Sequence, residues 1–196
     1  MKNSMMILVL AVGFIIQGCH PDRFVLNSQH PYRLFGKIMG DLDSFEQINE
    51  NTFKLKSGTV AIRHFMLTQG EIHFNYKIIK GDEIKFTLRA VSHLYEPDDG
   101  IAIQLSPTGT IVNENGKTKN QFDEMKLSSS NEKYVKFRNV GNLIRFRHDC
   151  DEEVIESEIP ATEFIFITVP KGTEVQIRGI EFDKIIRTSI EKMEEY

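Results

Sequence analysis

The residues best suited to binding chemistry lie at alternate positions of four segments that are expected to be β-strands. Their side chains carry planar hydrogen-bonding groups or an aromatic face, a combination that suits sugar binding. They are Arg63, His73, Asn75, Arg89, His93, Tyr95 and Gln104. If the four strands are neighbours, these side chains form one patch and predict a ligand site. The alternative is a solvated face, because antiparallel sheets commonly leave one polar side in water.

An acidic loop offers a second kind of site. Glu96, Asp98 and Asp99 lie in YEPDDG, which ends in a glycine. Because Ca²⁺ favours clustered carboxylate oxygens, the loop is a candidate calcium site, and the alternative is a solvated acidic turn. No other cofactor is predicted, since the chain has no His-x-x-x-His pair, phosphate-binding glycine-rich loop or nucleophile elbow.

Nucleophilic catalysis has one weak candidate. Cys150 lies two residues after His148, which would share its face of a strand and could act as a base. The surrounding acids, Asp149 and Asp151 to Glu153, disfavour a thiolate. We therefore expect an ordinary, partly buried cysteine, and no catalytic residue is assigned.

The amino-terminal segment differs from the rest of the chain. Lys2 precedes Met5 to Ile16, which are 12 residues without a charge. A membrane-spanning helix needs roughly 17–25 apolar residues, so this run is short. A basic start followed by a short apolar run predicts a secretory signal peptide. A buried helix at the N-terminus is the alternative.

The run ends in Ile16-Gln17-Gly18-Cys19, which resembles the lipobox of bacterial lipoproteins. The resemblance implies a signal peptide over residues 1–18, cleavage before Cys19 and a lipid on that cysteine, so membrane lipid is an expected partner. Residues 19–32 would then be the lipidated cysteine and a tether. His20, rather than Asp, follows the cysteine, which in enteric bacteria resembles lipoproteins sent to the outer membrane.

The elements that must position these groups are mostly β-strands. Strict alternation of apolar and polar residues marks 71–79, 84–90 and 101–106 as strands with one buried face. Lys80-Gly81-Asp82 predicts a hairpin turn between the first two, and Gly141-Asn142 predicts another between KYVKFRNV and NLIRFRHD.

The later strands complete an all-β domain. TEFIFITV has apolar residues on both of its alternating faces, so we expect it to be covered on both sides. Pro170 to Thr173 are then expected to turn the chain. Short strands with regular turns predict a two-sheet antiparallel jelly-roll sandwich over 33–183. Ile186, Ile190 and Met193 have helical spacing and predict a short C-terminal helix over 184–196.

Two stretches, GTVAIRHFMLTQGEIHFNYKIIKGDEIKFTLRA and VGNLIRFRHDCDEEV with the strands after it, are similar to the early and late strands of concanavalin A-like lectins and glucanases. The resemblance implies that fold. It also implies where a glucanase would keep its catalytic acids, on a Glu-x-Asp-x-Glu strand. Glu181-Phe-Asp183 begins such a pattern, but no second glutamate follows, so the catalytic residues are not matched.

The formal charge of −4 disfavours nucleic acid as a partner, because nucleic-acid binding needs a basic footprint. The hypothesis that fits the residues best is an exported, lipid-anchored envelope protein of the outer membrane. Its sandwich would bind a ligand such as glycan or cell-wall material. The alternative is an accessory protein that binds another envelope protein, and a glycoside hydrolase is the least expected function.

Overall fold

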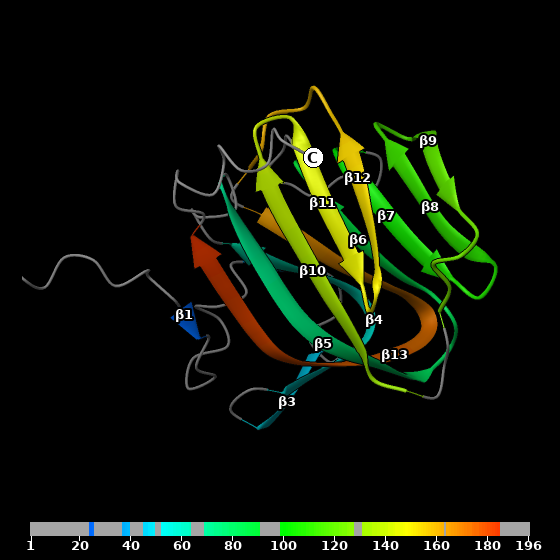
Figure 1. Ribbon diagram of the computed structural model, residues 1–196. Helices are drawn as coiled ribbons and strands as arrows, with labels where there is room; N and C mark the ends of the chain where they lie inside the picture. The colour runs from blue at the N-terminus through cyan, green and yellow to red at the C-terminus, as the bar shows by residue number, and fades with distance from the viewer. Residues whose placement is uncertain are drawn as a thin grey trace, which may run out of the picture.

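The computed structural model describes residues 24–25, 37–39, 45–49, 52–63, 69–90, 99–127, 131–162 and 164–184. These residues form an all-β structure (Figure 1). The strands are β1 (Phe24–Val25), β2 (Lys37–Met39), β3 (Phe45–Asn49), β4 (Thr52–Arg63), β5 (Gly70–Lys80), β6 (Ile84–Leu88), β7 (Ile101–Ser106), β8 (Gly109–Glu114), β9 (Lys117–Phe122), β10 (Lys133–Val140), β11 (Leu143–His148), β12 (Asp151–Glu156) and β13 (Phe164–Lys184). No helix that could span a membrane occurs among the described residues.

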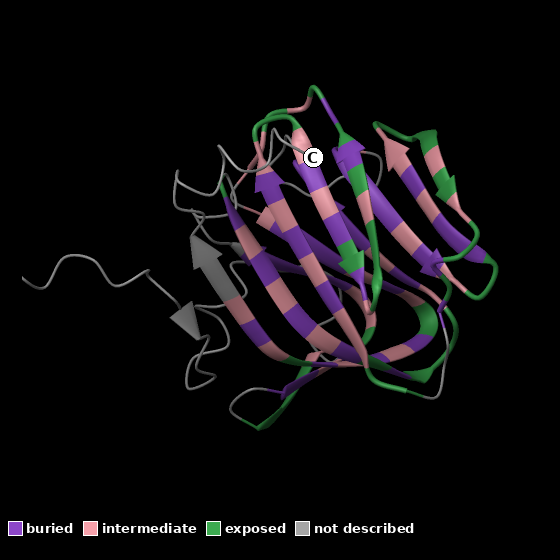
Figure 2. Ribbon diagram, in the orientation of Figure 1, coloured by how far each residue is buried: buried purple, intermediate pink, exposed green. Residues whose placement is uncertain are grey.

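The strands form because apolar and polar residues alternate along them. On β5, Ile72, Phe74 and Tyr76 are buried, whereas His73 and Asn75 between them are partly exposed. The same alternation appears as bands along β10 and β11 (Figure 2). One side of each strand therefore packs into a core and the other contacts solvent.

Two long strands curl the sheet into two facing layers. Residues 165–168 of β13 pair with β6, whereas residues 174–184 pair with β5, and β4 follows β13 along both halves. Both strands bend at the break in their register between the pairs Gly58–Val169 and Lys56–Glu174. Ser57 and Gly58 (φ 63° and 106°) and Gly172 (φ 88°) lie at this break. Figure 1 shows β13 turning from one layer into the other at this bend.

Each layer is a run of antiparallel strands that shares β13 and β4 with the other. Layer A contains β12, β11, β10, β5, the second half of β13, the first part of β4, and β3. Layer B contains β9, β8, β7, β6, the first half of β13, the later part of β4, and β2. This is a curled antiparallel sheet of the jelly-roll type, which confirms the predicted all-β jelly roll, although the two layers belong to one continuous sheet and not to two separate sheets.

Aromatic side chains join the layers through the core. Phe86 of layer B makes edge-to-face contacts with Phe74 and Phe137 of layer A, at ring-centroid distances of 5.8 and 5.3 Å. Such pairs add to the stabilisation that burial gives. On the other side of β13, Phe166 is buried against Ala61 and Ala90 in a second, smaller cluster. The expectation that this strand is covered on both faces is confirmed.

Several expectations about connections are wrong. Gly81 does not turn a hairpin, because β5 and β6 flank β13 in different layers, so the turn carries the chain between layers. Pro170 to Thr173 bend β13 without ending it. The hairpin at Gly141-Asn142 is confirmed.

The ends of the chain lie largely outside the described residues. These include the signal peptide and Cys19, and residues 185–196 of the predicted helix. Within the predicted tether, β1 pairs with β13, so Phe24 and Val25 belong to the sheet. Lys184, where the helix was expected to begin, is the last residue of β13.

Candidate functional site

The most distinctive polar surface lies on the outer face of the β10–β11 hairpin. Alternation turns Val135, Phe137, Ile144 and Phe146 into the core, so the residues between them face outward. The hairpin register places Lys136 opposite Arg147 and Arg138 opposite Arg145. Four cationic side chains therefore gather on two adjacent strands.

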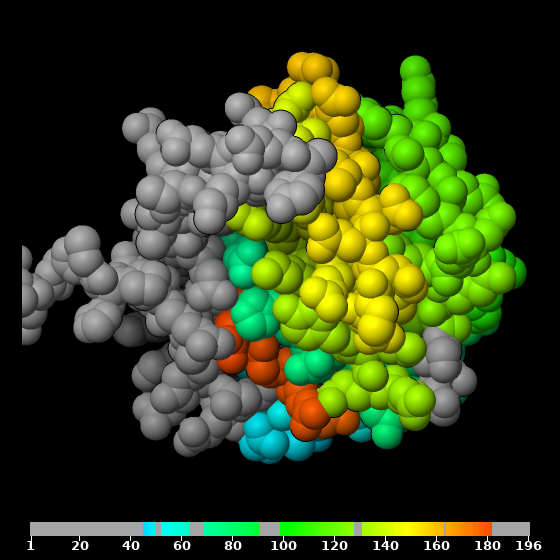
Figure 3. Space-filling model, viewed as in Figure 1, coloured from blue at the N-terminus to red at the C-terminus, as the bar shows by residue number. Residues whose placement is uncertain are grey.

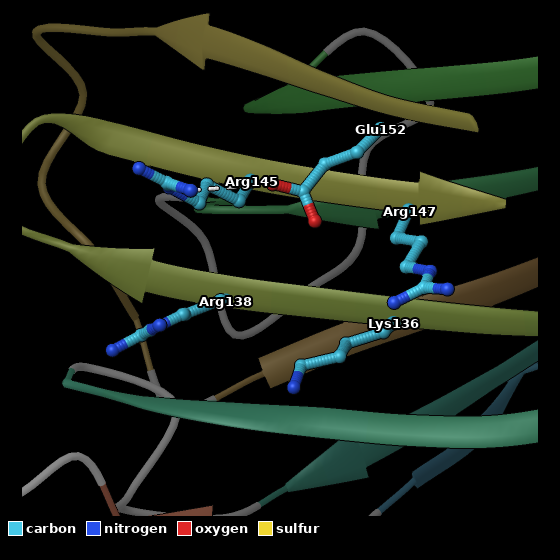
Figure 4. Close-up of a pocket in the computed structure, with 5 residues that line it drawn as sticks. All are labelled: Lys136, Arg138, Arg145, Arg147 and Glu152. Carbon is cyan, nitrogen blue, oxygen red and sulfur yellow. Dashed lines mark hydrogen bonds and ion pairs between the residues drawn. The ribbon is translucent and has the colours of Figure 1, made fainter. Parts of the chain in front are cut away.

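These four cations and Glu152 of β12 line a shallow pocket of about 70 Å³, which we call the cationic pocket (Figure 4). It lies on layer A, where side chains of β10, β11 and β12 lie beside those of β5 and β13 (Figure 3). The pocket has room for several water molecules or for one small polar group.

Acidic side chains neutralise the pocket only in part. Arg145 Nη1 lies 3.2 Å from Glu152 Oε1, and Lys136 Nζ lies 2.7 Å from Glu71 Oε1 of β5. Arg147 Nε donates a hydrogen bond of 2.8 Å to the backbone carbonyl of Asp149.

Arg138 differs from its neighbours, because it has no ion-pair or hydrogen-bond partner among the described residues. Its Nε atom and that of Arg145 are buried without a hydrogen-bond acceptor. Buried donors are normally paired, so two unpaired guanidinium nitrogens in one pocket are a structural reason to expect a ligand there.

A row of uncharged or titratable groups borders the pocket on β5 and β10. His73 lies opposite Lys136, and Asn75 lies opposite Tyr134. The rings of His73 and Tyr134 are 5.9 Å apart, and His73 Nε2 is 3.7 Å from Glu181 Oε2. We call His73, Asn75 and Tyr134 the polar row; they offer an aromatic surface beside amide and imidazole hydrogen-bonding groups.

The structure does not bring the sequence-predicted patch together. His73 and Asn75 share the outer face of layer A, whereas Gln104 lies on β7 in layer B. Arg63 is the last residue of β4, with its side chain outside the described part, and His93 and Tyr95 lie outside the described residues. The prediction assumed that the four strands are neighbours, but the curl of the sheet divides them between two layers.

Arg89 was expected on the polar face, and this is wrong because its side chain is 1% exposed. It directly follows β6 and has a positive φ of 55°, which reverses the direction that strand alternation would give its side chain. The guanidinium instead donates hydrogen bonds to acceptors in layer A. These are Asn139 Oδ1 (3.3 and 3.2 Å) and the backbone carbonyls of Ser157 (3.0 Å), Ile159 (2.8 Å), Gly141 (2.9 Å) and Leu143 (3.3 Å).

Arg89 therefore joins the two layers at one end of the sandwich. Burial lowers the pKa of Arg89, and the nearby carboxylate of Glu114 opposes that shift. An arginine stays protonated in either case, so its charge strengthens every one of these hydrogen bonds. Its contacts are with the fold itself, which indicates a structural role for this residue.

A second buried polar pair lies between the layers. Tyr76 Oη and His148 Nε2 are 2.8 Å apart. Burial lowers the pKa of His148 below its ordinary value of about 6.5, although Asp149 opposes the shift. Burial also raises the pKa of Tyr76 far above its ordinary range. Both side chains are therefore neutral near pH 7.

The remaining sequence candidates give little. Cys150 is exposed on the turn between β11 and β12, so the expectation of a partly buried thiol is wrong. The side chain of His148 is buried in the core, whereas Cys150 is exposed. No group of three His, Cys, Asp or Glu residues that could hold a metal occurs within the described ranges. Of the three predicted calcium ligands, Asp99 is described, whereas Glu96 and Asp98 lie outside the described residues. The calcium site thus stays a prediction.

The sequence alone does not assign the cationic pocket, although it contains the signal. K-x-R in KYVKFRNV and R-x-R in NLIRFRHD flank a turn that was correctly expected to form a hairpin. The register of a two-residue turn places those cations opposite each other.

Neither a protein-family model nor a curated protein is a significant match to this sequence. Solved structures do match. The chain is similar to a putative glycosyl hydrolase from Parabacteroides distasonis, with a TM-score of 0.61, 10% identity, and 84% of this chain and 100% of that chain covered. It is also similar to the exoplasmic/lumenal domain of VIP36 bound to Ca²⁺ and Man3GlcNAc, with a TM-score of 0.58, 13% identity, and coverage of 80% and 87%.

A third likeness is to the carbohydrate-binding module CBM66 from Bacillus subtilis, with a TM-score of 0.50, 11% identity, and coverage of 84% and 96%. These neighbours are concanavalin A-like lectin and glucanase domains. At such low identity the likeness establishes the fold and leaves the function open. The likeness confirms the concanavalin A-like fold that the resemblance of the strand pattern implied.

Proposed function

We propose that this protein is a lipid-anchored envelope lipoprotein whose β-sandwich binds a glycan on the outer face of layer A. The observation that carries the binding proposal is the cationic pocket with the polar row beside it. Sugar binding commonly pairs an aromatic surface with a few directional hydrogen-bonding groups, and this face offers both.

Proteins of similar fold that bind carbohydrate add support to the binding proposal. VIP36 was solved with a bound mannose-containing glycan, and CBM66 is a carbohydrate-binding module. Cell-wall material is the form of glycan that an envelope protein meets, and the outer membrane is the proposed location. The catalytic carboxylate pattern of glucanases is missing from the sequence, so binding without hydrolysis is the favoured activity.

A protein partner that adds a strand to a sheet edge is less favoured. One edge of layer A is β12, which exposes Asp151, Glu152 and Glu156, and one edge of layer B is β9, which exposes Lys117 and Lys119. Charged side chains on edge strands are a common device against strand addition.

The anchoring proposal rests on Ile16-Gln17-Gly18-Cys19. Cells that express the full chain should incorporate radiolabelled or clickable palmitate into it, and Cys19→Ala should abolish the label. Cys150→Ala is the matched control and should leave the label unchanged. Label that persists in Cys19→Ala would refute lipidation at this residue.

The binding proposal is tested by a glycan array probed with the full chain. Binding to at least one class of saccharide, weakened in Asn75→Ala and unchanged in Lys77→Ala, is the expected result. Lys77 is an exposed residue of the same strand outside the polar row. Absence of binding to every saccharide on an array that includes peptidoglycan fragments would count against the proposal.

A further inference from the structure

We infer that the cationic pocket recognises an acidic group on the glycan, a carboxylate, sulfate or phosphate. The inference rests on the proposed function for the saccharide and adds the charge of the ligand. It starts from the placement of the cations. Lys136 and Arg147 are directly opposite across the hairpin, as are Arg138 and Arg145.

These like-charge pairs do not by themselves stabilise the hairpin, although Glu71 lies opposite Arg138 on β5 and Glu152 lies opposite Arg147 on β12. Like charges directly opposite each other on neighbouring strands are destabilising. The chain as a whole carries a net charge of −4, so this cluster does not follow from a basic composition. Four cations beside two carboxylates leave an excess of positive charge on this face, which contrasts with the whole protein and favours an anionic ligand.

The available hydrogen-bond donors point to the same chemistry. Glu152 and Glu71 form ion pairs with Arg145 and Lys136. Among the described residues, Arg138 and Arg147 have no carboxylate within 4 Å, although Glu71 and Glu152 lie opposite them in the register. The Nε atoms of Arg138 and Arg145 are buried and lack acceptors. Guanidinium groups match the geometry of planar carboxylates and of phosphate or sulfate oxygens, to which they donate paired hydrogen bonds.

The size of the pocket limits what enters it. At about 70 Å³ it has room for an acidic substituent. A ring that carries this substituent would reach the polar row, because His73 is directly opposite Lys136. A uronic acid or a sulfated or phosphorylated sugar has this shape, with a charged substituent on a polar ring.

The test uses the full chain and three matched ligands in isothermal titration calorimetry at low salt. They are oligogalacturonate, its methyl ester, which has the same rings without charge, and a sulfated oligosaccharide of similar length. We expect one or both acidic ligands to bind and the methyl ester to bind at least about tenfold more weakly, since charge-assisted hydrogen bonds are lost.

Two variants localise the effect. Arg138→Gln should weaken binding of the acidic ligand about tenfold, and Arg147→Gln provides a second variant if the first does not fold. The matched control is Lys77→Gln, which removes one exposed cation from the same face. Lys77 is four residues from His73, about 14 Å along the strand, and its loss should change affinity less than about twofold. Circular dichroism confirms that each variant is folded.

The outcomes separate this inference from the proposed function. Equal binding of neutral and acidic saccharides, unaffected by Arg138→Gln, would overturn the inference and leave glycan binding standing. No binding of any saccharide would overturn both. Two further probes, inorganic phosphate and phosphatidylglycerol vesicles, cover other sources of an anion. If either binds in an Arg138-dependent way while no saccharide does, the pocket serves free phosphate or a membrane surface and the saccharide inference is wrong.

Discussion

Replacing Arg89 with methionine should remove a large part of the stability of the sandwich. The substitution keeps an unbranched side chain of similar length but removes every hydrogen bond that the Arg89 side chain donates from layer B to layer A. Two of the acceptors, Asn139 Oδ1 and the Ser157 carbonyl, belong to residues that are 4% and 1% exposed, so water does not readily replace the guanidinium there. The carbonyls of Ile159, Gly141 and Leu143 accept only partly buried bonds and are more easily rehydrated.

The magnitude follows from the two buried acceptors. A buried acceptor left without a partner costs about 1–3 kcal/mol, so two of them cost about 4 kcal/mol in the free energy of unfolding. The loss of stability is reduced because methionine carries no charge that must be buried. It is increased by any cavity that the smaller side chain leaves. With a urea m-value of about 2 kcal/mol/M, the unfolding midpoint should fall by about 2 M.

Urea titration followed by far-ultraviolet circular dichroism measures this loss, because the chain has no tryptophan for fluorescence. Arg178→Met is the matched control, since Arg178 is exposed and its partner in the described part of the chain is Glu132 on the surface. Its loss should cost less than about 1 kcal/mol. If Arg89→Met costs no more than Arg178→Met, the interpretation of Arg89 as the link between layers is refuted. Folded Arg89→Met should also keep glycan binding, because the residue lies outside the cationic pocket.

Two further perturbations test the interlayer turn and the buried histidine. Gly81→Ala should cost about 2 kcal/mol more than Gly172→Ala in urea unfolding, because an added Cβ at Gly81 meets Thr173 Cα at 2.8 Å whereas nothing lies within 4 Å at Gly172. Between pH 6.5 and 5, wild-type stability should fall by up to about 1.4 kcal/mol per pH unit, because the unfolded chain protonates His148 before the folded chain does. His148→Gln should flatten this dependence, as followed by the unfolding midpoint at each pH.

Each of these two predictions has an outcome that would contradict it. Both glycines have positive φ, 83° and 88°, so equal losses in the two alanine variants would mean that backbone strain alone matters and the contact with Thr173 does not. For His148, the depressed pKa means that its contribution is fully present above about pH 6.5 and is lost as the pH falls. An identical pH profile in wild type and His148→Gln would refute the assignment to this side chain.

Local pattern predicted the strands well and their neighbours poorly. Alternation identified the inward residues of β5, β6 and β7, because it reports which side of a strand is buried. It contains no information on which strand lies beside which, and β13 pairs with strands about a hundred residues earlier in the chain. The turn at Gly81 therefore resembled a hairpin although the two strands it joins lie in different layers.

The same limit explains the predicted binding patch. Parity gives Arg89 the outward side of its strand, but a single residue with positive φ reverses that direction and buries the guanidinium. Parity also grouped Gln104 with His73, although they lie in different layers. The β10–β11 cations were accessible to sequence reasoning, since a local turn fixes their register without any long-range pairing.

The charges around the cationic pocket indicate how an anionic ligand is selected. The next strand is β12, which exposes Asp151, Glu152 and Glu156 and lies about 4.8 Å from β11, well inside the Debye length of about 8 Å at physiological salt. The long-range field of the four cations is therefore weakened at that edge, and an extended polyanion crossing the hairpin would also cross acidic side chains. A single acidic substituent that enters the pocket avoids that repulsion and contacts the guanidinium groups of Arg138 and Arg145 that line it. Recognition on this surface thus depends on short-range, directional hydrogen bonds more than on net charge, which favours an acidic sugar over nucleic acid or an anionic membrane.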